Sequence, residues 1–252
     1  MESLEYRLYA YADQGKRDSQ QDVANCSLPE LQKDLGVICV LADGMGGLQD
    51  GRAAAEAAVE TTVRTFHQSA VTDTPEQILL RCCCFAQDAV RRIQTTPGEC
   101  GATFAAVLIR DDRCSFLSVG DSRIYLFRGG GLIQLTRDQN KAERIERQIA
   151  LGRLPEVART DAKRDALSTY IGIETLEQID RSSHSFALGA GDRLLLVSDG
   201  VFRTLDEQEM TEILCLPGEM VTMTMIQRVM AKDRPRQDNC TAAIVECLPA
   251  MP

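Results

Sequence analysis

The sequence lacks an excess of positive charge and any long apolar segment. Its 252 residues carry 28 Lys and Arg against 37 Asp and Glu, a formal net charge of −9. A protein that binds nucleic acid through its phosphates needs a basic surface, so this balance excludes that class of partner. No window approaches the roughly 20 consecutive apolar residues that span a membrane, and charges interrupt the start, MESLEYRLYA, where a secretory signal has its apolar core. We therefore expect a cytoplasmic protein with no membrane partner.

Histidine is scarce, and the cysteines have no metal-site spacing. The two histidines, His67 and His184, have no spacing to each other or to cysteine that is typical of metal ligands. No pair of the ten cysteines forms CxxC, and no cysteine is followed six residues later by arginine, which argues against the cysteine-nucleophile phosphatases. Since most cysteines lie in apolar runs such as GVICVLA, we expect reduced, mostly buried thiols.

Periodic hydrophobic patterns predict an α+β fold with strands in blocks and helices in pairs. No internal repeat or low-complexity linker divides the chain, so we expect a single catalytic domain over 1–252. The glycines at 129–131 predict a hairpin turn between two short strands. The expected helices cover 49–68, 75–94, 141–150, 206–215 and 219–232. The expected strands cover 6–12, 37–42, 103–109, 114–119, 123–127, 185–188, 193–197 and 241–247.

The segment at about 140–165 differs from the rest of the chain. It is highly charged, and after one helical stretch it continues as LGRLPEVARTDAKRD, which has little periodicity. A long irregular insertion in a compact domain is usually functional or mobile. We expect this segment to form a flap, or lid.

Five aspartates lie beside apolar strands, and most have glycine or a small polar residue next to them. An aspartate in this position can project into a cleft while the bare backbone approaches a ligand. Converging carboxylates repel one another unless a cation lies among them, and Mg²⁺ and Mn²⁺ prefer such oxygen ligands together with water. Ordinary Asp–Gly turn chemistry is the alternative for any one pair, but the set as a whole favours a metal site. The five are Asp22, Asp43, Asp121, Asp199 and Asp238.

These stretches resemble the motifs of the metal-dependent serine/threonine protein phosphatases of the PPM family (2C type), in the bacterial form with a catalytic domain alone. The resemblance runs from Gly15 to Val245, which is nearly the whole chain. It implies a four-layer αββα sandwich, with two antiparallel sheets face to face and helix pairs outside. The matching motifs, in order, are GKRDSQQD, DGMGG, GATFAAVLI, GDSRIY, LTRDQN, DALSTYIG, LLLVSDGVFRTL and DNCTAAIV.

The resemblance also implies a ligand set for two Mn²⁺ or Mg²⁺ ions. Asp43 corresponds to the carboxylate that bridges the ions, and the Gly44 carbonyl contributes to one of them. Asp199 and Asp238 correspond to ligands of the other ion. Asp22 corresponds to a position in or just behind the coordination sphere of the Gly44-side ion.

Two further residues complete the implied site. Asp121 resembles an aspartate that helps to hold a third, weaker metal ion beneath the flap in bacterial members, and Arg17 resembles the arginine that grips the substrate phosphate. The implied reaction is hydrolysis of phosphoserine and phosphothreonine in proteins by a metal-bridging hydroxide, because two dications lower the pKa of bound water. The expected partners are phosphorylated proteins and a bacterial serine/threonine kinase that the enzyme opposes, and we expect a monomer.

The chain departs from the family pattern at the first motif and around the flap. Gln20 and Gln21 stand where the family commonly has asparagine followed by an acidic residue, so one anionic ligand option becomes neutral. Gln139 and Asn140 replace the family's histidine and serine, and Thr169 replaces a frequent arginine. These changes predict altered substrate selection or third-metal binding at the flap, with the two-metal centre retained.

A catalytically weak family member that binds phosphoproteins as a regulatory module is the alternative. Loss of a metal-site aspartate would indicate such a protein. The sequence retains every one of them, so we favour an active phosphatase.

Overall fold

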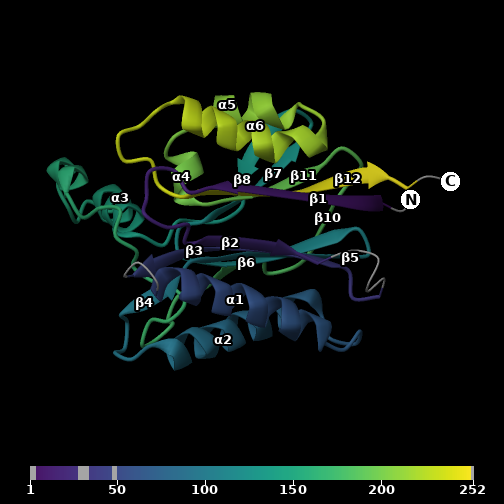
Figure 1. Cartoon of the computed structure of the whole chain (residues 1–252), viewed down its shortest axis with the longest axis horizontal. Coiled ribbons are helices and arrows are strands. Elements are labelled where there is room, and N and C mark those ends of the chain that lie inside the picture. Colours follow the sequence, from purple (N-terminus) through teal and green to yellow (C-terminus); the bar gives the residue numbers. More distant parts are fainter. Residues whose placement is uncertain (1–3, 28–33, 47–49, 251–252) are drawn as a thin grey trace.

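Two antiparallel β-sheets pack face to face, and a pair of helices covers the outer face of each sheet (Figure 1). The computed structural model describes residues 4–27, 34–46 and 50–250. This arrangement confirms the expected four-layer αββα sandwich. The covering helices are α1 (Asp50–His67) and α2 (Pro75–Ile93) on one sheet, and α5 (Glu207–Leu214) and α6 (Gly218–Ala231) on the other.

Each sheet combines strands that are distant in sequence. The first and last strands of the chain, β1 and β12, pair along ten residues, with Leu4 opposite Pro249. Across the first sheet, the strands are β1 (Leu4–Asp13), β12 (Cys240–Pro249), β11 (Arg193–Val197), β7 (Arg123–Arg128) and β8 (Gly131–Gln134). Across the second, they are β10 (Phe186–Ala187), β6 (Arg113–Val119), β5 (Phe104–Arg110), β3 (Val37–Gly46) and β2 (Asp22–Cys26). In addition, β4 (Cys100–Ala102) pairs with β3, and β9 (Asp180–Arg181) pairs with β6.

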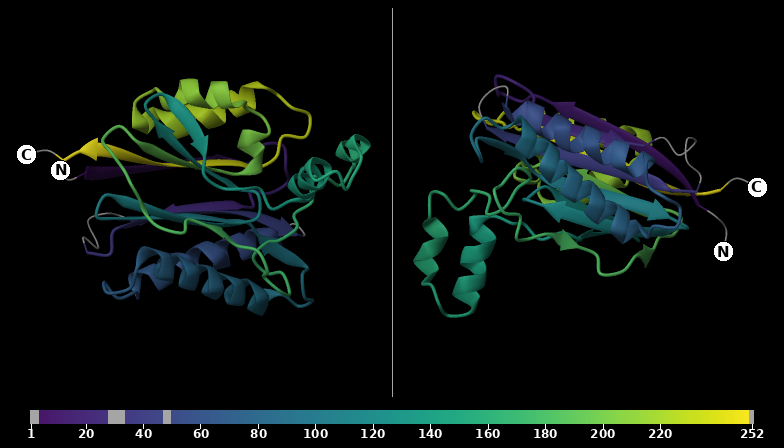
Figure 2. Two further views of the ribbon diagram at one scale, coloured as in Figure 1. Left: turned by 180° about the vertical axis from the view of Figure 1, so that it is seen from behind. Right: turned by 90° about the horizontal axis from the view of Figure 1, so that it is seen from below.

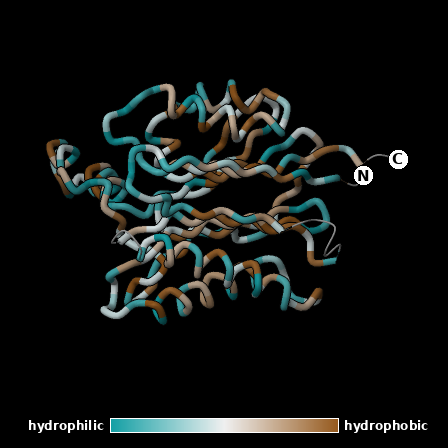
Figure 3. The backbone as a smooth tube through the Cα atoms, in the orientation of Figure 1, coloured by the Kyte–Doolittle hydropathy of each residue, from teal (hydrophilic) through white to brown (hydrophobic). Residues whose placement is uncertain are grey.

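The central strands are apolar on both faces because each sheet lies between another sheet and a helix pair. In β3, Cys39 and Leu41 belong to the core between the two sheets. Ile38, Val40 and Ala42 alternate with them and pack against the helix layer. Strands that are buried on both faces read as continuous hydrophobic runs, and Figure 3 shows such runs along both sheets.

The predicted helices and longer strands are confirmed, with boundaries that differ by a few residues. Gln49, at the start of the first predicted helix, lies outside the described residues. The prediction missed the short elements β2, β4, β9, α4 (Asp199–Phe202) and the 3₁₀ turn η2 (Glu156–Thr160), and it gave no bounds for β8, the short strand expected after the glycines at 129–131. Such segments are too short to show a period in the sequence. Within the described part of the chain, no helix has both the length and the apolar composition needed to cross a membrane.

Two hairpins use turn residues with positive φ. Gly129 and Gly130 have φ values of 58° and 81° and connect β7 to β8, which confirms the predicted turn. Asp111 and Asp112, with φ values of 52° and 56°, connect β5 to β6 in the same way. Two-residue loops with positive φ at both positions match the right-handed twist of the strands that they join.

The charged insertion leaves the sandwich at one end. Its first part is helix α3 (Lys141–Ala150), as predicted, and the Asn140 side chain caps it by accepting a hydrogen bond from the backbone N–H of Glu143 (3.0 Å). Figure 2 shows α3 and the chain that follows it standing apart from the four layers. That the segment at about 140–165 acts as a flap, or lid, stays a prediction.

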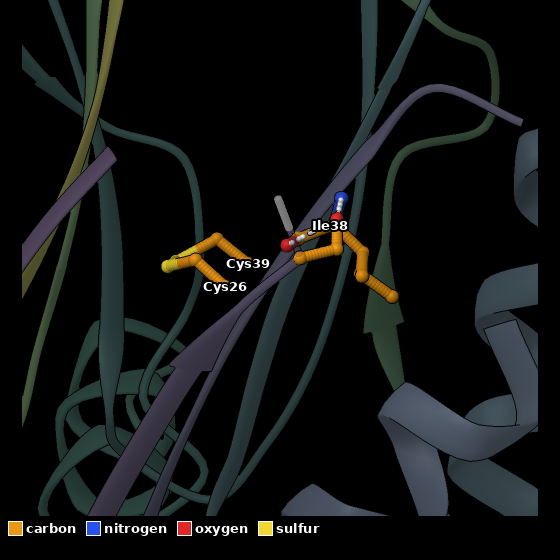
Figure 4. The surroundings of a disulfide bond; sticks show 4 residues. Cys26, Ile38 and Cys39 are labelled. Atoms are coloured by element: carbon orange, nitrogen blue, oxygen red, sulfur yellow. Dashed lines mark hydrogen bonds between the residues drawn. A yellow bond between two sulfur atoms is a disulfide. The ribbon is translucent and has the colours of Figure 1, made fainter. Parts of the chain in front are cut away.

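The expectation that all cysteines are reduced is wrong for one pair. Cys26 and Cys39 form a disulfide (Figure 4), and the other eight cysteines are free. The two residues lie opposite each other in the register of β2 and β3, with Cα atoms 4.1 Å apart. Figure 4 shows both side chains on one face of the strand and Ile38 on the other. The pairing depends on strand register, which the sequence spacing does not reveal.

A nearly buried ion pair fastens the first sheet to its helix layer. Arg193 donates to Glu246 Oε1 across β11 and β12 (2.6 Å), and their side chains are only 13% and 9% exposed. Arg193 also donates to the backbone carbonyls of Leu214 and Leu216, where α5 ends. The arginine therefore satisfies both a buried carboxylate and the open end of a helix.

Removing one member of this pair leaves a buried charge without its partner. We expect Arg193→Met to lower the free energy of unfolding by about 3 to 5 kcal/mol, measured by urea denaturation. The double variant Arg193→Met with Glu246→Leu should be more stable than Arg193→Met alone, because no unpaired charge remains. Additive losses from the two substitutions would contradict this explanation.

Candidate metal centre

Six of the seven site residues predicted from the sequence line one cleft. The cleft has a volume of about 650 Å³ and receives residues from both sheets and from the end of the flap. Asp22, the seventh, is only 3% exposed and lies next to the cleft residue Asp43, directly opposite it in the register of β2 and β3. The six lining residues are Arg17, Asp43, Gly44, Asp121, Asp199 and Asp238.

The five aspartates reach the cleft from different kinds of element. Asp22 begins β2, and Asp43 lies within β3, three residues before its end. Asp199 is the first residue of α4, which follows β11, while Asp238 precedes β12. Asp121 lies in the turn between β6 and β7. The expectation of strand-end aspartates is therefore correct for most of them, and pairing with β4 extends β3 beyond Asp43.

Thr103 fixes the backbone on both sides of Asp43. The Asp43 N–H donates to Thr103 Oγ1 (2.8 Å), and the Asp43 carbonyl accepts from the Thr103 N–H (2.9 Å). The Thr103 hydroxyl lies 2.6 Å from that of Ser122, the residue after Asp121. Thr103 therefore connects the backbone of Asp43 in β3 to the turn that carries Asp121.

Ser198 connects the two sheets at the cleft. Its hydroxyl donates to Asp22 Oδ2 (2.7 Å) and accepts from the backbone N–H of Thr241 (3.0 Å). Asp22 belongs to the second sheet, whereas Ser198 immediately precedes Asp199 at the end of β11 in the first. The other carboxylate oxygen, Asp22 Oδ1, is buried and has no hydrogen-bond partner among the described residues.

Asn239 holds the loop that carries Arg17. Its Oδ1 accepts from the backbone N–H of Gln21 (2.8 Å), and its Nδ2 donates to the carbonyls of Gln14 and Ser19 (2.8 and 2.9 Å). Arg17 itself donates from Nη2 to Asp238 Oδ2 (2.6 Å) and is 58% exposed. The guanidinium therefore lies at the rim of the cleft, next to a candidate metal ligand.

Two glycines permit the close backbone contacts that form the cleft. A Cβ at Gly44 would lie 2.1 Å from the carbonyl oxygen of Gly51, and one at Gly200 would lie 1.9 Å from that of Asn239. Neither position has room for a side chain. The glycine after Asp43 and the glycine after Asp199 are therefore required by packing, which explains the two Asp–Gly pairs.

Burial raises the pKa values of the carboxyl groups in this cluster. The pKa of Asp22 rises to about 6, mainly through burial, although the Ser198 hydroxyl lowers it. Burial also raises the pKa of Asp199 to about 7, against the opposing effect of Arg203. The pKa of Asp43 lies well above its usual value because of burial and then the charges of neighbouring aspartates, Asp22 first among them. Burial and mutual repulsion therefore disfavour the charged forms of these carboxyl groups, and a cation among them would relieve that cost.

Two of the three departures from the family pattern around the flap, Gln139 and Asn140, make hydrogen bonds that hold the local structure. Gln139 Oε1 accepts from the N–H of Gly120 (2.9 Å), and the Gln139 N–H donates to the carbonyl of Gly120 (2.9 Å). Gly120 has a φ of 98° and immediately precedes Asp121, so Gln139 fixes the turn that presents this aspartate. Asn140 caps α3, and the buried Thr169 hydroxyl has no hydrogen-bond partner within the described ranges.

Four residues that organise the site are not predicted from the sequence. Ser198 and Asn239 adjoin Asp199 and Asp238 and belong to the motifs LLLVSDGVFRTL and DNCTAAIV, but nothing in the sequence marks their hydrogen bonds. Thr103 looked like an ordinary strand residue. Arg203, four residues after Asp199, lies in the cleft and forms ion pairs with its carboxylates.

The donor set fits hard divalent cations. Mg²⁺ usually takes only one or two carboxylates and keeps several waters. The cleft offers carboxylates, a backbone carbonyl at Gly44 and, behind them, the unpartnered oxygen of Asp22. Among the described residues, no three acidic, histidine or cysteine side chains converge closely enough to hold one ion by themselves. Water and backbone oxygen would therefore complete the coordination.

Comparison with known proteins identifies the family. The family model described as protein phosphatase 2C matches residues 18–234, so the chain belongs to this family. This membership confirms the class expected from the sequence, a metal-dependent serine/threonine protein phosphatase of the PPM family. The serine/threonine phosphatase Stp of Listeria innocua is 28% identical over 229 residues, with 85% of this chain and 86% of the relative covered. Protein phosphatase PhpP of Streptococcus pneumoniae is 27% identical over 238 residues, covering 91% and 92%.

Solved structures show the same fold. The serine/threonine phosphatase of S. agalactiae aligns with a TM-score of 0.80 at 25% identity, covering 96% of this chain and 99% of that one. The catalytic domain of PstP in complex with two manganese ions aligns with a TM-score of 0.75 at 24% identity, covering 98% and 100%.

The raised pKa values predict how metal binding depends on pH. A carboxyl group whose pKa is raised by folding contributes to the stability of the metal-free protein. This contribution is fully present at pH values below about 4, the pKa of the group in the unfolded chain. That contribution is lost as the pH rises through about 6 for Asp22 and about 7 for Asp199. Metal ions need the deprotonated carboxylates, so their stabilising effect should grow over the same window.

We expect saturating Mn²⁺ to raise the melting temperature by about 5 to 10 °C at pH 7.5 and by much less at pH 5.5, measured by thermal denaturation. Asp22→Asn should reduce this difference between the two pH values. Carboxyl groups with ordinary pKa values would instead give the same Mn²⁺-induced increase in melting temperature at both pH values. That result would contradict the prediction.

Proposed function

We propose that the chain hydrolyses phosphoserine and phosphothreonine in proteins at the cleft that contains Asp43. The observation that carries this proposal is the convergence of Arg17, Asp43, Gly44, Asp199 and Asp238 in that cleft. Membership of the protein phosphatase 2C family and the phosphatase relatives support it. The bound manganese of the PstP structure supports a centre of two Mn²⁺ or Mg²⁺ ions.

Asp43 and the Gly44 carbonyl would contribute to one ion, and Asp43, Asp199 and Asp238 would contribute to the other. Water would complete both coordination spheres, because no three acidic side chains of the described residues converge closely enough to hold an ion by themselves. When bound, two such ions supply a water of lowered pKa and neutralise charge on the phosphoryl group. The chain supplies the fixed geometry. Thr103 holds Asp43 on both sides of its backbone, so this carboxylate is already in place.

Asp22 would act from behind the Gly44-side ion. Ser198 donates to one of its oxygens, which favours the charged form, while the other oxygen is left for a metal ion or a metal-bound water. The neutral Gln20 also supports this position, since its side chain accepts from the N–H of Asp22 (2.9 Å). The departures at the first motif therefore preserve the placement of the aspartate.

Arg17 would bind the phosphate of the substrate. Its guanidinium stays charged at every physiological pH and offers a fork of donors that matches phosphate oxygens. The contact with Asp238 holds the side chain at the rim. An incoming phosphate would compete with this carboxylate for the guanidinium.

The regulatory-module alternative is not favoured, because Asp43, Asp199 and Asp238 line the cleft and Asp22 lies directly opposite Asp43 beside it. A cognate serine/threonine kinase, a monomeric state and a cytoplasmic location stay predictions. So does the extent of the catalytic domain over 1–252.

The function predicts metal-dependent turnover of a phosphothreonine peptide. We expect activity with Mn²⁺ and none with EDTA, measured by phosphate release. Asp43→Asn and Asp199→Asn should each lower kcat by about 10³-fold or more, because several kcal/mol of transition-state stabilisation are lost. Cys84→Ser changes an exposed residue of α2 and should leave turnover intact. Activity that survives chelation would contradict the mechanism.

Arg17 is tested through substrate binding. We expect Arg17→Ala to raise KM for the phosphopeptide about tenfold or more, since a charge-assisted hydrogen bond contributes roughly 1.5 to 3 kcal/mol. Arg7→Ala is the matched control, because Arg7 is similarly exposed (51%), pairs with Glu5 and does not line the cleft. Equal effects of the two substitutions would remove Arg17 from the phosphate site.

A further inference from the structure

One arginine lies beside Asp121, the residue that the family resemblance assigns to a third metal ion. Arg203 faces three carboxylates with three different nitrogen atoms. Nη2 lies 3.1 Å from Asp121 Oδ2, Nε lies 3.3 Å from Asp199 Oδ2, and Nη1 lies 3.6 Å from Asp165 Oδ2. A single side-chain cation is therefore surrounded by carboxylates, as a bound metal ion would be.

The backbone places Arg203 in this position. It follows α4, and its N–H donates to the carbonyl of Asp199 (3.0 Å), so the two side chains share one face of a helical turn. The Asp121 side chain is 5% exposed and that of Asp199 is 18% exposed. Buried carboxylates need a compensating positive charge, and the guanidinium of Arg203 provides that charge without a bound metal ion.

The charge of this cation does not depend on pH in the physiological range. A guanidinium is protonated at neutral pH. Arg203 is thus a permanent positive charge among these side chains.

We propose that the Arg203 guanidinium replaces the third metal ion, so that this phosphatase holds two ions and Asp121 serves as a partner of Arg203. The inference rests on the two-metal centre of the proposed function. Arg203 occupies Oδ2 of Asp121 and of Asp199, which a third ion would need as ligands. Its charge also repels a divalent cation at the same place.

The same contacts connect the flap to the metal centre. Asp165 lies at the end of the flap segment and, with Ala166 and Leu167, lines the cleft. Its side chain is 63% exposed, so its ion pair with Arg203 is the weakest of the three by distance and by screening. Arg203 is itself 35% exposed, and a third ion could enter only if the guanidinium moved out toward solvent.

Metal stoichiometry tests this proposal directly. The full chain is dialysed against millimolar Mn²⁺, and bound manganese per chain is measured by mass spectrometry and by water-proton relaxation. We expect two ions in the wild type and in Arg203→Lys, which keeps the charge. Arg203→Asn should bind three ions, because the carboxylate oxygens are then free to act as ligands and the positive charge that repels a divalent cation is gone.

Two further variants separate the possible causes. Asp165→Asn should still bind two ions, since Arg203 keeps its contacts with Asp121 and Asp199. Arg128→Asn removes a comparable arginine ion pair, with Asp192 (2.6 Å), outside the cleft and should also bind two. These controls distinguish a local effect of Arg203 from a general effect of lost positive charge.

The number of ions bound by the wild type and by Arg203→Asn decides whether the proposal holds. Three ions in the wild type would overturn the proposal while leaving the two-metal function intact, and this measurement needs no variant to fold. Two ions in a folded Arg203→Asn protein would also overturn it. Binding of no ions by the wild type would instead contradict the proposed function itself.

Discussion

The mutual repulsion of buried carboxylates is the constraint on which the cleft depends. Asp22, Asp43, Asp121 and Asp199 are brought together by the fold, and burial raises the pKa of each. Folding therefore stores an electrostatic cost at this point, which cations relieve. The net charge of −9 excludes a basic surface, and the cluster shows that part of this acidity is located at one site.

The chain answers this repulsion partly with its own residues. Ser198 donates to Asp22, Arg17 pairs with Asp238, and Arg203 lies between Asp121 and Asp199. These contacts hold the carboxylates in a defined arrangement before a metal ion arrives. Arg17 and Arg203 differ in their exposure and in their position in the cleft. Arg17 is more exposed and at the rim, where a phosphate can reach it, whereas Arg203 is directed to the carboxylates beside the flap.

The two-sheet architecture makes this arrangement possible. The site needs residues that are more than 170 positions apart in sequence, such as Asp22 and Ser198. Packing two antiparallel sheets face to face brings their strand ends to a common edge, and glycine at positions 44 and 200 allows the backbones to approach closely. Thr103 and Asn239 then fix the loops by hydrogen bonds to the backbone. The rigid core supports a site in which the ligands themselves come from loops and strand ends.

Sequence patterns predicted the long helices, the flap helix and the aspartates of the cleft, whereas the resemblance to the PPM family implied the four layers and the places of Arg17 and Gly44. The patterns succeeded because continuous apolar runs and ordered Asp–Gly motifs are local signals. The short strands were missed because β2 and β4 contain too few residues to show a period. The disulfide of Cys26 and Cys39, the bridge from Ser198 to Asp22 and the position of Arg203 were missed for another reason. Each depends on register or packing between segments that lie apart in the sequence.

The positions of bound manganese ions test the assignment of the metal centre most directly. A crystal structure with bound Mn²⁺, recorded with anomalous scattering from manganese, should show two anomalous peaks in the cleft, both in contact with Asp43, and no peak between Asp121 and Arg203. Peaks away from Asp43 would contradict the assignment of the metal centre. A third peak at Asp121, with Arg203 turned out to solvent, would contradict the role given to that arginine.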